Sequence, residues 1–282
     1  MNSVIAIIGC GNVGSLLAYK LYTTTACDII LVSHNKVKAY SNYYDIRDAQ
    51  PFVCNHNISV GDYSDIANAD VVINCAGDSS LLRSRNRLSE FDNSKRIAND
   101  IINNLNSVGF NGIFINVMNP CDEVTYLFRD LDIVRTKILG TGTLLETLRL
   151  RRIVHDEYGI LTNSCVVGNH GVNNLILWDS DATNLCIDNQ KVLQKVRNRV
   201  WKIYEGKGFT NFGIVDSVLL IVNAIIHDLK EELCVSTHMG SIYGVDSRCI
   251  SIPCVVGSEG IVRVNRYDNV QYLIDQLFKG GG

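Results

Sequence analysis

"SVIAIIGCGNVG", residues 3–14, decides the fold of the first half of the chain. It opens with a run of aliphatic residues typical of a buried strand, and a GxGxxG motif follows at once. Such a motif between a strand and a helix indicates a dinucleotide-binding turn. Gly9 permits the tight turn, Gly11 lets the backbone approach a pyrophosphate, and Gly14 lets helix and strand pack closely. The helix that follows contributes free N–H groups and a positive dipole for the phosphates.

The first 140 residues continue this alternation of short apolar runs with helical patterns. We expect strands within 3–9, 28–33, 69–77, 112–119 and 136–142, and helices within 12–24, 37–50, 89–106 and 121–131. Strands that alternate with helices require right-handed crossovers and a parallel sheet covered on both faces. The sequence therefore predicts a doubly wound α/β domain, a Rossmann fold, over residues 1–141.

The pattern changes after residue 142. We expect helices over 143–159, roughly 188–206, 215–229 and 270–278, extended runs around residue 170, strands within 232–239 and 249–257, and turns at 257–260 and 263–269. Strands joined by hairpins rather than crossovers indicate a mixed α+β domain, which we assign to residues 142–282 as the substrate domain. Since no linker separates the halves, we expect them to pack as one unit.

Composition excludes several classes of protein. The chain is 46% hydrophobic and 20% charged, as in ordinary globular proteins, and its net charge of −3 gives no reason to expect nucleic acid as partner. No apolar run reaches the roughly 18 residues of a membrane span, and no basic region precedes the first strand, so we expect neither membrane insertion nor a signal peptide. The ten cysteines are scattered without CxxC pairs, and the histidines lack zinc-ligand spacing. We therefore expect a cytoplasmic protein with reduced thiols and no metal.

The end of the second strand bears on the choice of cofactor. A dinucleotide domain usually carries an acidic residue there, which bonds the adenosine ribose, but this chain has Ser33. Serine can still bond a hydroxyl, whereas no carboxylate remains to repel a 2′-phosphate. His34, Lys36 or Lys38 would attract such a phosphate. We expect NAD as the cofactor, with NADP as the alternative.

Two further stretches carry side chains suited to chemistry. Glu146 and Arg149 lie three residues apart and share a face of the predicted helix. This spacing is also common in surface ion pairs, but this helix begins just past the last parallel strand, where such sheets bind ligands. His170 lies in a short glycine turn, "GNHG", where a histidine is either an ordinary loop residue or a proton donor.

Four motifs occur in one order and spacing: "GCGNVG" at 9–14, "MNP" at 118–120, "GTGTLLETLRLR" at 140–151 and "GNHG" at 168–171. By these motifs nearly the whole chain resembles the L-lactate/malate dehydrogenase superfamily. Within it, "GTGTLLETLR", "GKGFTNFG" at 206–213 and "GFNGIF" at 109–114 resemble the L-2-hydroxyisocaproate dehydrogenases most. The resemblance implies an oxidoreductase that reversibly reduces a 2-oxo acid to the L-2-hydroxy acid with NAD or NADP.

The resemblance also implies catalytic roles. His170 would be the general acid that protonates the substrate oxygen, with Glu146 fixing its tautomer and favouring its charged form. Arg149 would clamp the substrate carboxylate with a bidentate fork. Asn119 would bond the reacting oxygen or groups beside the nicotinamide. Arg87 would polarise the carbonyl from a loop that closes and excludes water.

Other residues would form the walls of the two sites. Thr210, Leu81 and Leu82 would contact the substrate, and Ile214 would lie beside the nicotinamide. The implied cofactor contacts are Gly9, Gly11, Asn12, Val13, Gly14, Ser33, Ala76, Gly77, Asn119 and Ile214.

The sequence departs from the family pattern at the partner of the histidine. Glu146 stands where aspartate is usual, and its side chain is longer by one C–C bond, about 1.5 Å. A shift of that size would weaken catalysis unless the helix is displaced to compensate. The loop arginine also has neighbours, Arg83 and Arg85. We prefer Arg87, because "RLSEF" matches the passage from loop to helix best.

The same loop indicates the substrate. Malate-type members carry an arginine and lactate-type members a glutamine where this chain has Ser80, Leu81 and Leu82. Aliphatic side chains favour an apolar substrate side chain, because burying a further charge beside them is costly. We expect 2-oxo acids with aliphatic side chains, and lactate-type or malate-type specificity is the alternative, since Arg83 or Arg85 would reach a distal carboxylate.

Three questions stay open. A catalytically silent dinucleotide-binding regulatory protein would also fit Ser33 and Glu146. The NAD- and metal-dependent glycosidases share the fold and would need a cysteine and histidine as metal ligands, for which Cys121 is the candidate. The resemblance implies a homodimer or homotetramer, and the apolar stripes of the helices at 37–50 and 217–229 suit either an interface or ordinary core packing.

Overall fold

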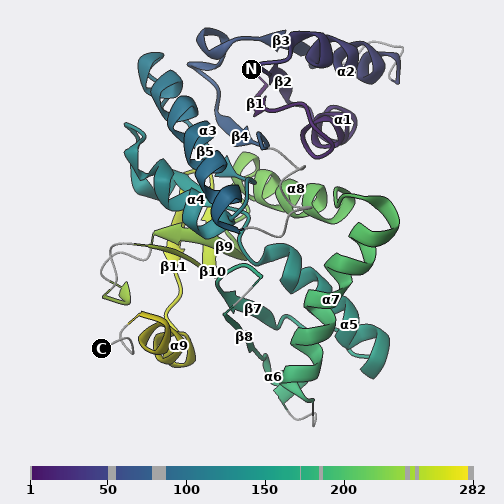
Figure 1. Cartoon of the computed structure of the whole chain (residues 1–282), viewed down its shortest axis with the longest axis vertical. Helices are drawn as coiled ribbons and strands as arrows, with labels where there is room; N and C mark the ends of the chain where they lie inside the picture. The colour runs from purple at the N-terminus through teal and green to yellow at the C-terminus, as the bar shows by residue number, and fades with distance from the viewer. Residues whose placement is uncertain are drawn as a thin grey trace.

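One continuous sheet runs through both halves of the chain in the computed structural model (Figure 1). The structure describes residues 2–49, 55–77, 87–171, 173–183, 187–238, 242–244 and 248–278. Within these ranges no helix is long and apolar enough to cross a bilayer.

Six parallel strands form the first part of the sheet, in the order β3-β2-β1-β4-β5-β6. They are β1 (Val4–Ile8), β2 (Asp28–Val32), β3 (Ile58–Gly61), β4 (Val71–Asn74), β5 (Ile113–Asn116) and β6 (Ile138–Gly140). The strand order reverses between β1 and β4, and sheets of this kind bind their ligands at such a reversal. The predicted doubly wound domain is confirmed.

Helices cover both faces of these strands, because successive strand residues point to opposite sides. Ile5 and Ile7 of β1 pack in one core cluster with α1 (Gly14–Thr24) and α2 (Lys36–Asp48). Ala6 and Ile8 pack in a second cluster with α3 (Arg87–Ser107) and α4 (Cys121–Leu127).

The second part of the sheet is antiparallel. Gly140 of β6 pairs with Ser236 of β9 (Glu231–His238), and the order continues through β10 (Cys249–Gly257), β7 (Cys165–Gly168) and β8 (Asn174–Leu177). The remaining elements are α5 (Leu144–Tyr158), α6 (Ser180–Thr183), α7 (Asn189–Lys207), α8 (Phe212–Ile226), β11 (Gly260–Val264) and α9 (Asp268–Phe278). Hairpins join β7 to β8, β9 to β10 and β10 to β11, which confirms the expected mixed α+β half.

Two strands and a short helix were not predicted. β3 has only four residues, two of them buried, and among the described strands it pairs with β2 alone. Within the same part of the chain β11 pairs with β10 alone, and it includes Arg263 and Val264, so the turn predicted at 263–269 begins too early. Short edge strands need little burial, and for that reason they carry little hydrophobic pattern. The helix α6 has only four residues, which is too short to show a helical periodicity in the sequence.

The two apolar stripes differ in their surroundings. The stripe of α8 lies in the core through Val218, Ile221 and Val222, so core packing accounts for it. α2 instead exposes Val37, Tyr40 and Tyr44. The homo-oligomer stays a prediction. All eight cysteines in the described ranges are free thiols, and seven of them are buried.

The turn between β1 and α1 tolerates a side chain at one glycine but not at another. A Cβ atom added to Gly14 would lie 1.9 Å from the carbonyl oxygen of Gly9, whereas no described residue lies within 4 Å of a Cβ added to Gly11. We expect Gly14→Ala to lower the free energy of unfolding by about 1–3 kcal/mol, because α1 must move away from β1. Gly11→Ala is the matched control and should keep wild-type stability. Equal stability of the two variants in denaturant titrations would show that the close contact does not constrain the turn.

Candidate active site

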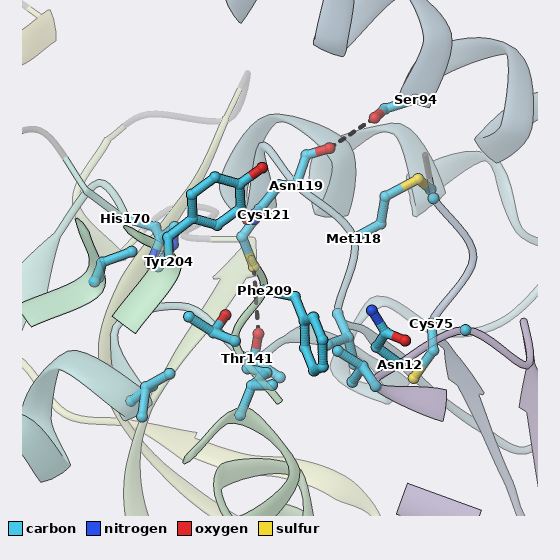
Figure 2. Close-up of a pocket in the computed structure, with 18 of the residues that line it drawn as sticks. Asn12, Cys75, Ser94, Met118, Asn119, Cys121, Thr141, His170, Tyr204 and Phe209 are labelled. Carbon is cyan, nitrogen blue, oxygen red and sulfur yellow. Dashed lines mark hydrogen bonds between the residues drawn. The ribbon is translucent and has the colours of Figure 1, made fainter. Parts of the chain in front are cut away.

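A cavity of about 290 Å³ lies where the carboxyl ends of the parallel strands meet the antiparallel half (Figure 2). Its walls come from the turn after β1, the segments that follow β4, β5 and β6, the first turns of α5, and the turn after β7. The remaining walls come from α3, through Asn93 and Ser94, and from α7, α8 and the segment between them. The cavity thus extends from the dinucleotide-type turn to His170.

Most of the predicted site residues line this one cavity. From the predicted cofactor contacts it includes Gly11, Asn12, Val13, Ala76, Gly77, Asn119 and Ile214, and from the predicted substrate and catalytic residues Arg149, His170 and Thr210. The fold therefore brings together side chains that are spread over two hundred residues of sequence.

Other predicted residues do not line the cavity. Gly9 and Gly14 lie within the turn itself, and Glu146 lies behind His170. Ser33 follows β2 as a buried residue, and its Oγ accepts a hydrogen bond from the N–H of Asn35 at 3.2 Å. Leu81 and Leu82 fall outside the described residues. Arg87 begins α3, but its side chain falls outside the described part as well.

His170 and Glu146 form the central pair of the site. Nδ1 of His170 lies 3.2 Å from Oε2 of Glu146, and the side chains are 32% and 4% exposed, respectively. The carboxylate is therefore shielded behind the imidazole, which faces the cavity. The extra carbon of glutamate does not prevent this contact.

A second buried carboxylate holds the backbone of the same turn. The N–H of His170 donates to Oδ2 of Asp122 at 2.7 Å, and Oγ of Ser251 donates to Oδ1 of Asp122 at 2.9 Å. The N–H of Gly171 donates to Oε1 of Glu146 at 3.1 Å. Sequence reasoning did not assign a role to Asp122. Its position two residues after the "MNP" motif is the signal that could have indicated one.

These carboxylates determine the charge of the imidazole. Burial by itself lowers the pKa of His170, but the charge and hydrogen bond of Glu146, together with the charge of Asp122, outweigh it. The pKa of His170 is therefore raised above its ordinary value of 6.5. Burial also lowers the pKa of Arg149, although the charge of Glu146 opposes this, and an arginine remains a cation at neutral pH.

The charge of the cavity wall follows from these shifts. Among the described lining residues, Arg149 and His170 are the basic groups, and the others are apolar or uncharged. Such a site can bind a small carboxylate at the guanidinium and exchange a proton at the imidazole.

α7 supplies a wall that sequence reasoning missed. Val200, Trp201 and Tyr204 line the cavity, and Figure 2 shows Tyr204 and His170 among the side chains around it. The three residues lie within four positions of one another on the helix that precedes "GKGFTNFG". That spacing is also typical of ordinary core packing, so the sequence alone could not single them out.

Cys121 lies beside the end of β6. Its Sγ accepts a hydrogen bond from the N–H of Gly142 at 3.3 Å and lies 3.8 Å from Oγ1 of Thr141. Burial raises the pKa of this thiol to about 12, so it is protonated at neutral pH.

The residues around the turn after β1 fit a dinucleotide. Val13, at the N-cap of α1, makes no side-chain cap, and apart from Ser15, whose N–H donates to the carbonyl oxygen of Gly11 at 3.0 Å, the N–H groups at this end of the helix can bind phosphate oxygens. A Cβ on Gly11 would meet none of the described residues within 4 Å, which leaves its backbone open to close approach. The cavity continues from this turn to His170 and Arg149.

Comparison with known proteins agrees over both halves. A family model described as "lactate/malate dehydrogenase, NAD binding domain" matches residues 3–140, and one described as "lactate/malate dehydrogenase, alpha/beta C-terminal domain" matches residues 143–273. An L-lactate dehydrogenase of Salinibacter ruber is 30% identical over 280 residues, which cover 91% of this chain and 87% of that relative. An L-lactate dehydrogenase 2 of Listeria monocytogenes is 29% identical, covering 92% of this chain and 90% of the relative.

Solved structures share the fold over almost the full length. The L-lactate dehydrogenase of Clostridium thermocellum has a TM-score of 0.85 and 26% sequence identity, covering 99% of this chain and 98% of that one. A lactate dehydrogenase from a Medee basin deep-sea metagenome library has a TM-score of 0.88 at 23% identity, covering 98% and 95% of the two chains.

The raised pKa of His170 depends on Glu146. We expect Glu146→Gln to bring the pKa of His170 down from its raised value, because burial and Arg149 both lower it and only Asp122 then opposes them. The wild-type pKa lies above 6.5, the value in the unfolded chain. The protonated ring therefore stabilises the folded state fully below pH 6.5, and this stabilisation is lost as the pH rises through the raised pKa. NMR titration of the His170 ring measures the shift. A pKa unchanged by the substitution would mean that Glu146 does not set the charge of the imidazole.

Proposed function

Because the chain belongs to the lactate/malate dehydrogenase family, we propose that it is an NAD-dependent L-2-hydroxy acid dehydrogenase that reversibly reduces a 2-oxo acid. The observation that carries the proposal is the His170–Glu146 pair on the wall of a cavity that also contains Arg149 and the dinucleotide-type turn. A bound nicotinamide coenzyme supplies the hydride in such a reaction.

Each side chain of the site has a task in this reaction. Arg149 binds the substrate carboxylate through its planar guanidinium, and burial strengthens this interaction because little water competes for it. His170 gives its proton to the substrate oxygen in the direction of reduction and takes it back in oxidation. With Nδ1 held by Glu146, the other ring nitrogen, Nε2, is the one that meets the substrate.

Asn119 lines the same cavity, and we assign its amide to the reacting oxygen or to groups beside the nicotinamide. Its backbone oxygen accepts a hydrogen bond from Oγ of Ser94 at 2.7 Å, which ties the segment after β5 to α3. We keep the proposed role of Arg87 in polarising the substrate carbonyl. We also keep the proposal that Leu81 and Leu82 contact the variable end of the substrate.

The lining of the cavity supports a monocarboxylic substrate with an apolar side chain. The described wall offers one guanidinium, Arg149, which the first carboxylate occupies. Val200, Trp201 and Leu145 present apolar surface instead of a second guanidinium. A second carboxylate there would be desolvated without a partner, which is costly. The alternatives are a lactate-type enzyme, as the names of the relatives indicate, and a malate-type enzyme that uses Arg83 or Arg85.

The surroundings of Ser33 support NAD over NADP. Nζ of Lys36 donates to the backbone oxygen of Gly61 at 2.7 Å and to the carboxylate of Asp62 at 2.5 Å. This lysine is therefore already paired, which leaves His34 and Lys38 as the exposed basic groups near the end of β2. We propose NAD as the preferred coenzyme and weaker use of NADP.

Two other functions have less support. A silent dinucleotide-binding protein would not need the buried carboxylate that holds the pKa of His170 above 6.5. A metal-dependent glycosidase would need Cys121 and a histidine to share a metal with further ligands, and the described part of the chain contains no group of three or more His, Cys, Asp or Glu side chains that could hold one.

Turnover tests the proposal. The purified protein should oxidise NADH, and NADPH less efficiently, with a panel of 2-oxo acids. We expect a higher kcat/KM for unbranched and branched aliphatic side chains than for oxaloacetate. Coenzyme binding without turnover of any 2-oxo acid would favour the silent protein, and a preference for oxaloacetate would favour the malate-type enzyme.

His170→Ala should remove the chemical step but leave coenzyme binding intact. General acids contribute about 10²–10⁴-fold to rate, and we expect a loss of kcat in that range. The matched control is His155→Ala, at an exposed histidine in the last turn of α5. A His170→Ala variant with turnover within a few fold of the control would rule out His170 as the proton donor.

A further inference from the structure

The second oxygen of the Glu146 carboxylate has two partners of its own. Oε2 faces Nδ1 of His170, while Oε1 accepts the N–H of Gly171 at 3.1 Å and the side-chain amide of Asn174 at 3.5 Å. Gly171 and Asn174 thus bind the carboxylate oxygen that does not face the imidazole. Asn174 is the first residue of β8 and pairs through its backbone with Gly168, at the end of β7.

Arg197 on α7 fixes the orientation of this amide. Its Nη2 donates to Oδ1 of Asn174 at 2.6 Å. A guanidinium can only donate, so the amide oxygen must face Arg197. The amide NH₂ group is then left facing Glu146. Four side chains from α5, β8, α7 and the turn after β7 therefore form one chain of contacts, His170–Glu146–Asn174–Arg197.

We propose that Asn174, oriented by Arg197, is a positioning residue that holds the Glu146 carboxylate against His170. This inference rests on the proposed function for its kinetic consequences but not for its structural ones. Asn174 is not among the described residues that line the cavity, and it acts through Glu146.

Glutamate at position 146 creates the need for such a residue. It has one more rotatable bond than the aspartate usual in the family, so its carboxylate loses more conformational freedom when it is held in one place. The extra length also lets the carboxylate swing away from Nδ1. The N–H of Gly171 and the amide of Asn174 both donate to Oε1, so rotation about the last side-chain bond would break two contacts instead of one.

The position of the Glu146 carboxylate controls the pKa of His170. Glu146 and Asp122 raise the pKa of His170, whereas burial and Arg149 lower it. If the carboxylate moved away from Nδ1, its contribution would shrink and burial would dominate. The imidazole would then lose its proton at lower pH.

The experiment uses two substitutions of Asn174 that separate positioning from a merely structural role. Asn174→Leu removes both the N–H toward Glu146 and the acceptor for Arg197. Asn174→Asp keeps an acceptor for Arg197 but removes the donor and places a like charge beside Glu146. The control is Asn198→Leu, at an exposed position on α7.

We expect both Asn174 variants to lose roughly ten- to a hundredfold in kcat at pH 8, with KM for NADH unchanged, because the proton donor is misplaced. In Asn174→Leu the pKa of His170, measured by NMR in the coenzyme-free protein, should fall by about one unit. Asn198→Leu should match the wild type in both measurements.

Two outcomes would overturn the role proposed for Asn174. An Asn174→Asp variant with wild-type kcat would overturn the proposal even if Asn174→Leu failed to fold, since a purely structural role is satisfied by the retained partner of Arg197. An unchanged or raised pKa of His170 in Asn174→Leu would also overturn it. Absence of turnover in the wild type would refute the proposed function instead, while the NMR titration would still test the role of Asn174.

Discussion

The junction between β6 and β9 is the constraint on which the site depends. Gly140 pairs there with Ser236, and α5 begins at Leu144 after a sharp turn. Gly142 makes that turn with a φ of +51°, and a Cβ at this position would lie 2.4 Å from Oγ of Ser251. The first turn of α5 is therefore pressed against the antiparallel strands. This places Glu146 and Arg149 at the carboxyl ends of the parallel strands, beside the dinucleotide-type turn.

Ser251 of β10 links the same junction to the histidine. It faces Gly142, bonds Asp122, and pairs with Gly168 at the end of the strand that leads into the His170 turn. Two carboxylates are buried here, and isolated buried charges are costly. N–H or O–H donors stabilise each carboxylate and keep it close to the imidazole of His170. From there the negative charges favour the protonated form of the ring. The charges of these two carboxylates outweigh the effect of burial and raise the pKa of His170.

Much of this arrangement follows from the sequence, because its parts have local signatures. The glycines at 9, 11 and 14 between a strand and a helix determine the first turn, and alternating patterns determine the parallel sheet. The spacing of Glu146 and Arg149 puts them on one helical face. Contacts between distant elements have no such signature: Asn174 and Arg197 meet only because α7 packs against β8. Edge strands such as β3 bury too little to be seen, and Leu81, Leu82 and the side chain of Arg87 fall outside what the structure describes.

The central claim is that folding places Nδ1 of His170 against Glu146 and leaves Nε2 for the substrate. The ¹⁵N chemical shifts of the two ring nitrogens, measured at a pH above the pKa of His170, test it most directly. We predict a neutral ring with its proton on Nδ1, because only that nitrogen has the carboxylate as acceptor. A ring with its proton on Nε2, or an equal mixture of the two tautomers, would contradict the account.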